Sequence, residues 1–141
     1  MNAEQRNKIV IRSELSQPVS VCILLNQGKY VMQLRDEKEG INEPGRWGLF
    51  GGYRHQFEMP ARAMKRELKE EIGLEVTPKF AFSWQYSNVF HADITDQYDK
   101  IILGEGQSFG SYTLDELCEM ETSRGAISVL SIYETYEKED V

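Results

Sequence analysis

Three glutamates that stand close together, Glu67, Glu70 and Glu71, are the residues of this sequence with the clearest chemical potential. They belong to the segment from Pro60 to Ile72, where apolar residues recur at intervals of three and four and therefore predict a helix. At about 100° per residue the three carboxylates share one sector of that helix, and like charges at this spacing repel each other. A compensating charge is therefore expected beside them.

A divalent cation is one such compensating charge. The basic residues of the helix occupy another sector, and only Arg66 stands four residues before one of the glutamates, Glu70. Converging carboxylate oxygens suit hard ions such as Mg²⁺ and Mn²⁺. The alternative is a solvated helix face, which charged clusters such as KEE usually form. The spacing alone leaves both interpretations open.

The whole stretch from Gly51 to Leu74, GGYRHQFEMPARAMKRELKEEIGL, resembles the signature of the Nudix hydrolases. That signature is GX5EX7REUXEEXGU, where U is a bulky aliphatic residue. Its specified positions are all filled here, by Gly52, Glu58, Arg66, Glu67, Leu68, Glu70, Glu71, Gly73 and Leu74. The resemblance implies an α+β Nudix fold, in which a mixed sheet is sandwiched between helices, and a single Nudix domain over residues 1–141.

The resemblance also implies a role for the charged residues of this signature. Glu67, Glu70 and Glu71 match catalytic metal ligands, and the backbone carbonyl of Gly51 matches a further ligand. Arg66 is similar to the family arginine that orients the acidic side chains. Which of the three glutamates acts as a general base depends on geometry.

The other signature residues are implied to be structural. Glu58 resembles the glutamate that braces the loop, and Gly52 and Gly73 resemble glycines that permit backbone conformations opposed by a Cβ atom. The loop departs from common family usage at positions outside the specified set, which hold Phe50, His55 and Phe57. These departures bear on the shape of the loop and on the substrate more than on the carboxylates.

Members of the Nudix family hydrolyse a diphosphate linkage in a nucleoside diphosphate attached to a further group X. The resemblance therefore implies a pyrophosphohydrolase that uses Mg²⁺, with Mn²⁺ as a substitute, on a nucleoside triphosphate or a nucleotide sugar. The physical reason for the metal is that a diphosphate repels an incoming hydroxide unless a cation withdraws charge. The alternative is a Nudix-fold sensor that binds a nucleotide without cleaving it, which the intact set of acids disfavours.

Two charged residues outside the signature are further candidates. Glu105, in LGEGQ, resembles a glutamate that many family members carry before the second helix as an additional ligand or base; a solvated turn residue is the alternative. Arg35, at the end of a predicted strand, has a donor fork that suits a substrate phosphate. An ion pair with Asp36 or Glu37 is the alternative for Arg35.

Aromatic residues offer candidates for stacking on a nucleobase. Trp47 is the predicted substrate-binding aromatic, and Trp84 and Tyr86 are further possibilities. Because Phe80, Phe82, Trp84 and Tyr86 alternate along a strand-like segment, they also predict a buried strand with one aromatic face.

The elements that must position these residues alternate between strand and helix. A hairpin is predicted from 18–26 and 29–35 around a glycine turn. Further strands are predicted at 47–52, 78–94, 100–106 and 108–112. Thr113 and Glu116 have the spacing of a capping box, and 126–138 predicts a C-terminal helix. Together these elements predict a mixed sheet flanked by helices.

The composition limits the remaining possibilities. With 141 residues and 40% hydrophobic residues, one domain with its own core is expected. A net charge of −7 disfavours a nucleic-acid polymer as partner. No segment predicts a signal peptide or a membrane span, so a cytoplasmic protein is expected, with a homodimer as one possible assembly. Cys22 and Cys118 are predicted to be buried, reduced thiols.

Overall fold

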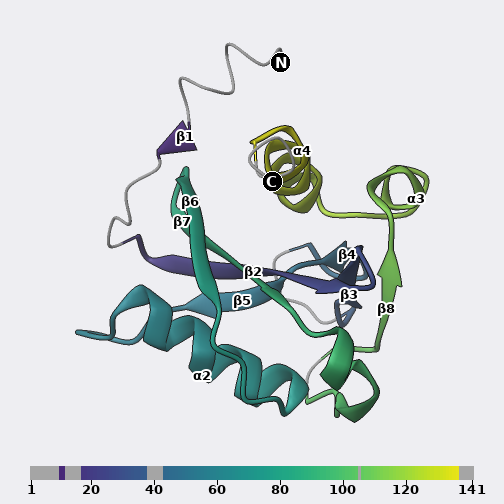
Figure 1. Cartoon of the computed structure of the whole chain (residues 1–141). Coiled ribbons are helices and arrows are strands. Elements are labelled where there is room, and N and C mark those ends of the chain that lie inside the picture. Colours follow the sequence, from purple (N-terminus) through teal and green to yellow (C-terminus); the bar gives the residue numbers. More distant parts are fainter. Residues whose placement is uncertain (1–9, 12–16, 38–42, 105, 137–141) are drawn as a thin grey trace.

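The computed structural model describes residues 10–11, 17–37, 43–104 and 106–136 of the chain. They form a mixed eight-stranded sheet with helices on both faces (Figure 1), which confirms the predicted α+β fold. The strands in chain order are β1 (Val10–Ile11), β2 (Val19–Asn26), β3 (Lys29–Leu34), β4 (Trp47–Gly48), β5 (Phe50–Tyr53), β6 (Lys79–Trp84), β7 (Ser87–Asp93) and β8 (Ser108–Tyr112).

Strand β2 is the centre of the sheet. It pairs in parallel with β7 and antiparallel with both β3 and β5. Strand β5 pairs with the first half of β2, and β3 pairs with its last residues. The β2–β3 hairpin was predicted, and Gln27 and Gly28 turn it with φ of 52° and 79°. Outward from these strands, β6 follows β7 and pairs with β1, whereas β4 and β8 pair with β3.

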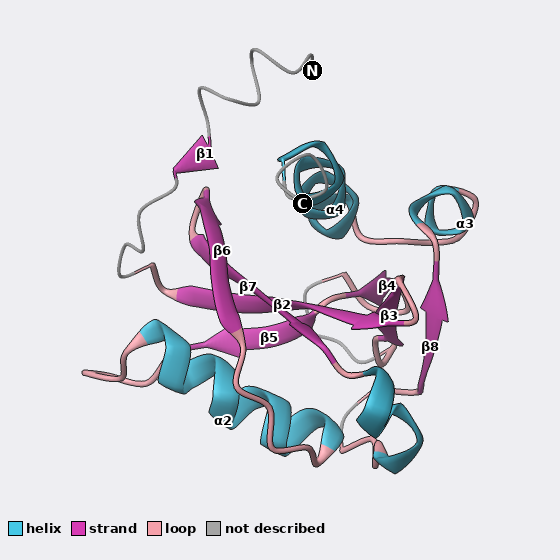
Figure 2. Ribbon diagram, in the orientation of Figure 1, coloured by secondary structure: helices cyan, strands magenta, loops and turns pink. Residues whose placement is uncertain are grey.

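The helices lie on opposite faces of this sheet (Figure 2). They are α2 (Pro60–Ile72), α3 (Leu114–Cys118) and α4 (Arg124–Tyr136), with a short 3₁₀ helix, η1 (Thr95–Lys100), after β7. Helix α2 has the predicted bounds and ends at Gly73, whose φ of 71° allows its N–H to bond Lys69. The predicted capping box of Thr113 and Glu116 is confirmed. Helix α4 begins two residues before its predicted start, and residues 137–138 lie outside the described part.

Two hydrophobic cores result, one on each face. Alternate residues of β2 face opposite sides, so Cys22 and Leu24 pack with α2 whereas Ile23 packs with α4. Cys22 is fully buried, and burial together with the charge of Glu71 raises the pKa of its thiol. Cys118 is exposed, which corrects the prediction that it is buried; both cysteines are free thiols.

Two strand predictions were wrong in detail. Segment 78–94 is a hairpin whose strand β6 carries a register shift between Phe80 and Phe82, so these rings pack in opposite cores and not on one aromatic face. Tyr86 lies in its turn, 76% exposed. Residues 101–104 form no strand, because the N–H groups of Ile102 and Gly104 bond carbonyls at the end of α2. Strand β1 was not predicted.

None of the helices in the described ranges combines the length and the apolar character that crossing a bilayer requires.

Candidate active site

The three glutamates of α2 differ in exposure. Glu71 is 3% exposed and flanks the apolar face that packs on the sheet, whereas the Glu70 side chain is 52% exposed. The Glu67 side chain is 14% exposed and lies between these extremes. The sector predicted from the helical wheel therefore runs from the interior to solvent, and its carboxylates are unequally solvated.

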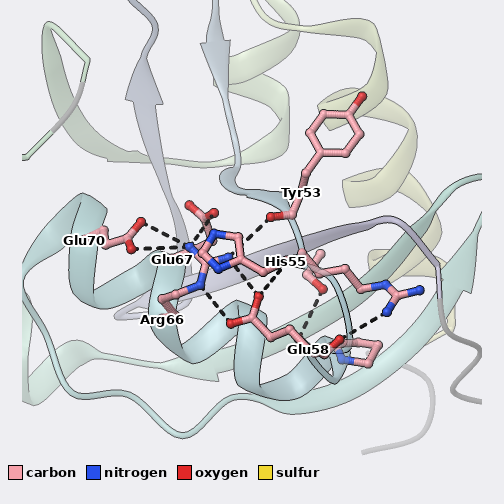
Figure 3. A network of polar contacts seen from close by, with 9 residues as sticks. Tyr53, His55, Glu58, Arg66, Glu67 and Glu70 are labelled. Carbon is pink, nitrogen blue, oxygen red and sulfur yellow. Dashed lines mark hydrogen bonds and ion pairs between the residues drawn. The ribbon is translucent and has the colours of Figure 1, made fainter.

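Arg66 provides the charge that compensates two of these glutamates (Figure 3). Its Nη1 contacts Glu67 Oε1 at 3.1 Å and Glu70 Oε2 at 3.2 Å. Its Nη2 donates to the backbone carbonyl of Tyr53 at 3.3 Å, which ties α2 to the end of β5. The sequence predicted the contact with Glu70 from the four-residue spacing, but the contacts with the strand and with Glu67 depend on the fold.

Glu58 holds the other side of the same guanidinium. Its carboxylate accepts from Arg66 Nε at 2.8 Å and Nη2 at 3.0 Å, and it also accepts from the backbone N–H of His55 at 2.8 Å. The bonds with Arg66, followed by the bond with His55, lower the pKa of Glu58 to about 2. The bond with Glu58 in turn raises the pKa of Arg66. This two-point contact fits the bracing role that the family resemblance implies for Glu58.

Acid should reveal the contribution of Glu58 to stability. Because its folded pKa lies below the ordinary 4.5, its contribution is fully present above about pH 4.5 and is lost as the pH falls through about 2. We expect Glu58→Gln to lower the free energy of unfolding by about 1–2 kcal/mol at pH 7. The difference should shrink in acid. Urea denaturation of both proteins between pH 7 and pH 2 measures it, and two parallel pH profiles would contradict this account.

The paired glycines of β5 allow two close approaches. Gly51 has φ of 154°, and a Cβ there would lie 2.2 Å from the carbonyl oxygen of Ser20 in β2. A Cβ on Gly52 would lie 2.8 Å from Glu67 Oε1, so its absence leaves the space that the carboxylate occupies. Gly52 thus forms part of a cradle for the Glu67 carboxylate.

The donor chemistry of this cluster fits a hard divalent ion, because carboxylate oxygens are the preferred ligands of Mg²⁺ and Mn²⁺. The side-chain arrangement is that of an acid cluster held by arginine: in the described ranges no three acidic, His or Cys side chains are grouped to hold an ion. Glu70 is the most exposed of the three and is paired with Arg66. For the three carboxylates to share an ion, Glu70 has to turn away from that guanidinium.

A cavity of about 370 Å³ adjoins the glycines on the α4 side of the sheet. Its lining combines apolar walls from β2 and α4 with polar groups from the surrounding loops: Val19, Val21, Arg35, Glu43, Gly48, Leu49, Gly51, Gly52, Tyr53, Trp84, Gln85, Ser87, Ser123, Gly125, Ala126 and Val129. This volume lies within the range of small-molecule sites. The cavity and the acid cluster share one neighbour, because Gly52 lines the cavity and the Glu67 carboxylate lies against the same glycine.

The candidate site residues outside the signature lie in different parts of the structure. Arg35 lines the cavity, and in the described residues it forms no ion pair with Asp36 or Glu37. Trp47 does not line the cavity; its ring packs edge to face on Tyr112, with centroids 5.1 Å apart. Its role in substrate binding stays a prediction. Glu105 lies outside the described residues.

Sequence reasoning missed Tyr53 and the contribution of α4 to the cavity. Tyr53 directly follows the paired glycines, so its position was a usable signal. No sequence pattern indicated that Ser123, just before α4, and Gly125, in its first turn, line the same cavity as β2. Trp84 was considered for stacking and does line the cavity.

The fold and the site together define a small α+β domain that carries an acid cluster on a loop and helix beside a ligand-sized cavity. The model of the NUDIX domain matches residues 16–122, and the chain belongs to this family. This membership supports a pyrophosphohydrolase. No match was found among curated proteins.

Several solved structures share the fold. The MutT protein from Methanosarcina mazei has 21% identity and a TM-score of 0.67, over 89% of this chain and 98% of that chain. The E. coli ORF135 protein has 21% identity and a TM-score of 0.65, over 84% and 89%. A bifunctional NMN adenylyltransferase/ADP ribose pyrophosphatase from Francisella tularensis, complexed with AMP and a Mn ion, has 15% identity and a TM-score of 0.63, over 86% and 42%. At these identities the similarity establishes the fold alone.

Proposed function

We propose that this chain is a metal-dependent hydrolase that cleaves a diphosphate linkage in a small nucleotide-linked substrate. The observation that carries the proposal is that the acid cluster around Arg66 lies against Gly52, a residue that also lines a ligand-sized cavity. The Francisella structure that shares the fold is a complex with AMP and a Mn ion, and we propose ligands of the same kinds for this chain.

Glu67, Glu70 and Glu71, with the backbone carbonyl of Gly51, are the proposed ligands of Mg²⁺, and Mn²⁺ is the proposed substitute. When bound, the ion supplies positive charge that offsets the charge of the phosphoryl oxygens. The three side chains differ in solvation, and a carboxylate among them that is not fully engaged accepts a proton from the attacking water. The bonds between Arg66 and Glu58 hold the loop against the helix while Glu70 leaves Arg66 and turns to the ion.

The cavity is the proposed site of the organic part of the substrate. Its valine and tryptophan side chains suit a planar apolar face, and Arg35, which lines the cavity, offers donors for a phosphate oxygen. The diphosphate is then placed over the paired glycines, beside the acid cluster. We also propose that the described fold acts as one Nudix domain, in the cytoplasm.

Added Mg²⁺ or Mn²⁺ should stabilise the folded protein. Because an ion that binds only the native state stabilises it by mass action, about 100-fold excess over the dissociation constant adds about 2.7 kcal/mol. We expect the thermal midpoint to rise by several degrees, together with a heat of binding in calorimetry. Lys69→Gln is the matched control and should respond as the parent does, because the Lys69 side chain forms an ion pair with the exposed Glu75. An unchanged midpoint and no heat at millimolar ion would contradict the site.

Catalysis is tested by incubating the purified protein with nucleoside triphosphates, ADP-ribose and UDP-glucose, each with Mg²⁺ or with EDTA. The proposal expects cleavage of at least one compound with Mg²⁺ and none with EDTA. Tight binding of a nucleotide without cleavage of any compound would instead support the sensor alternative.

A further inference from the structure

The turn between β5 and α2 holds a bulky residue in a conformation that favours glycine. Residues 55–58 form this turn, which is closed by a bond of 3.0 Å from the N–H of Glu58 to the carbonyl of His55. Phe57, at the third position, has φ of 65°, which is disfavoured for a residue with a Cβ. Its side chain is 90% exposed, so packing in a core does not offset this cost. Polar contacts around the turn have to hold it in this shape.

The side chain of Glu58 makes one set of these contacts (Figure 3). Its carboxylate accepts from the N–H of His55, at the start of the turn, and from Arg66 in α2. The same guanidinium contacts Glu67 and Glu70 of the acid cluster. Because the backbone of the turn places the Glu58 carboxylate on Arg66, a shift of the turn would alter the support of the cluster.

Arg54, directly before the turn, makes a second set of contacts. Its Nη1 donates to the backbone carbonyl of Glu58 at 3.2 Å, and its Nε donates to the backbone carbonyl of Gln17 at 3.0 Å. Its own backbone N–H donates to the carbonyl of Pro18 at 3.0 Å. Arg54 therefore connects the last residue of the turn to the segment that enters β2.

That segment is anchored in the interior of the sheet. The N–H of Gln17 donates to Asn88 Oδ1 at 3.0 Å, and Asn88 Nδ2 donates to Ser83 Oγ at 2.7 Å. Asn88 in β7 and Ser83 in β6 are both fully buried. The guanidinium of Arg54 suits the link between Gln17 and the turn, because it presents several N–H donors in fixed directions.

We propose that Arg54 is a positioning residue of the candidate active site. It holds the turn in place against the strain at Phe57, and in this way it keeps the Glu58 carboxylate on Arg66. Without Arg54 the turn relaxes, Glu58 moves away from Arg66, and the acid cluster loses one of its supports. The effect on turnover rests on the proposed function, whereas the effect on the contact between Glu58 and Arg66 does not.

Two measurements on the whole chain test this role. The first is turnover with Mg²⁺ of the compound that the parent cleaves among nucleoside triphosphates, ADP-ribose and UDP-glucose. Arg54→Met should lower kcat about tenfold and change KM less than about twofold, because it displaces groups that act in the reaction. The second is the exchange of the Arg66 Nε–H proton by NMR. This proton is bonded to Glu58, so its exchange should be about tenfold faster in Arg54→Met.

Phe57→Gly is the variant that separates positioning from general stability. Glycine adopts a φ of 65° without strain, so the turn should depend less on Arg54. In the Phe57→Gly background, Arg54→Met should therefore change both kcat and the exchange rate by about threefold or less. An arginine that only stabilises the fold would give the same loss in both backgrounds.

Two further variants complete the comparison. Arg54→Lys keeps a single donor group and should give an intermediate loss of kcat. Arg62→Met, at an exposed position of α2, is the matched control and should keep the parental kcat and exchange rate. If Arg54→Met does not fold, the Arg54→Lys loss is the one that Phe57→Gly should reduce.

Several results would overturn the inference. They are parental exchange of the Arg66 Nε–H in Arg54→Met, equal losses with and without Phe57→Gly, and unfolding of both Arg54 variants in both backgrounds. Faster exchange in Arg62→Met as well would also overturn it. If the exchange changes and is rescued as expected but the parent cleaves no compound, the role of Arg54 is upheld and the proposed catalysis is contradicted.

Discussion

Replacing Glu70 or Glu71 by glutamine is expected to lower kcat by about 10²–10³-fold, because glutamine keeps the shape of the side chain but loses the charge that holds the ion. The fold should persist. The Glu70 side chain is half exposed, and its pairing with Arg66 is of the kind that contributes little to stability. Neutralising Glu71, which is buried, removes the cost of keeping a charge out of water.

The control for these variants is Lys69→Gln, in the same helix. Lys69 pairs with Glu75 at 3.1 Å, with both side chains largely exposed, so its loss should leave turnover nearly unchanged. Turnover with Mg²⁺ and thermal melting in EDTA are measured on all variants. Parental rates in both glutamine variants would refute the catalytic assignment, and unfolding of both would mean that the cluster is structural.

Gly51→Ala is expected to lower the free energy of unfolding by about 3 kcal/mol or more. The new Cβ would lie 2.2 Å from the carbonyl oxygen of Ser20 and 2.8 Å from the Cα of Val21, and neither backbone atom can move without separating β5 from β2. The paired glycines and the carbonyl of Tyr53 would move with β5. Urea denaturation measures the loss.

Gly28→Ala separates the cost of a positive φ from the cost of a steric clash. Gly28 also has positive φ, at 79°, but a Cβ there meets no atom within 4 Å. Its substitution should therefore cost only about 1 kcal/mol, the price of the backbone conformation. Equal losses in the two variants would show that the close contact with Ser20 is unimportant.

Helix α2 and its contribution to the site were predictable from local sequence. The three-and-four spacing, Pro60 at the start and Gly73 at the end act within the helix itself, so they give its bounds without knowledge of the fold. The resemblance supplied roles for its charged residues, and the structure adds the contacts. The bond between Arg66 and Glu58 spans eight residues and depends on how the loop folds back.

The errors have identifiable physical causes. The alternation of Phe80 and Phe82 predicts one face, but the register shift between them changes the direction of the side chains without a sequence signal. The apolar run at 101–104 looks like a strand, yet its N–H groups bond the end of α2 instead of a neighbouring strand. Cys118 ends a helix of five residues, in which Leu117 is the buried residue. Each outcome depended on tertiary partners.

Hydrolysis in ¹⁸O-labelled water tests the central claim most directly. The compound that the protein cleaves is incubated with enzyme and Mg²⁺, and the products are examined by mass spectrometry and ³¹P NMR. The account predicts one ¹⁸O atom on one of the two phosphoryl groups released from the diphosphate, and no cleavage in EDTA. Failure to cleave any nucleotide or nucleotide sugar with Mg²⁺ or Mn²⁺, or products that carry no label, would contradict it.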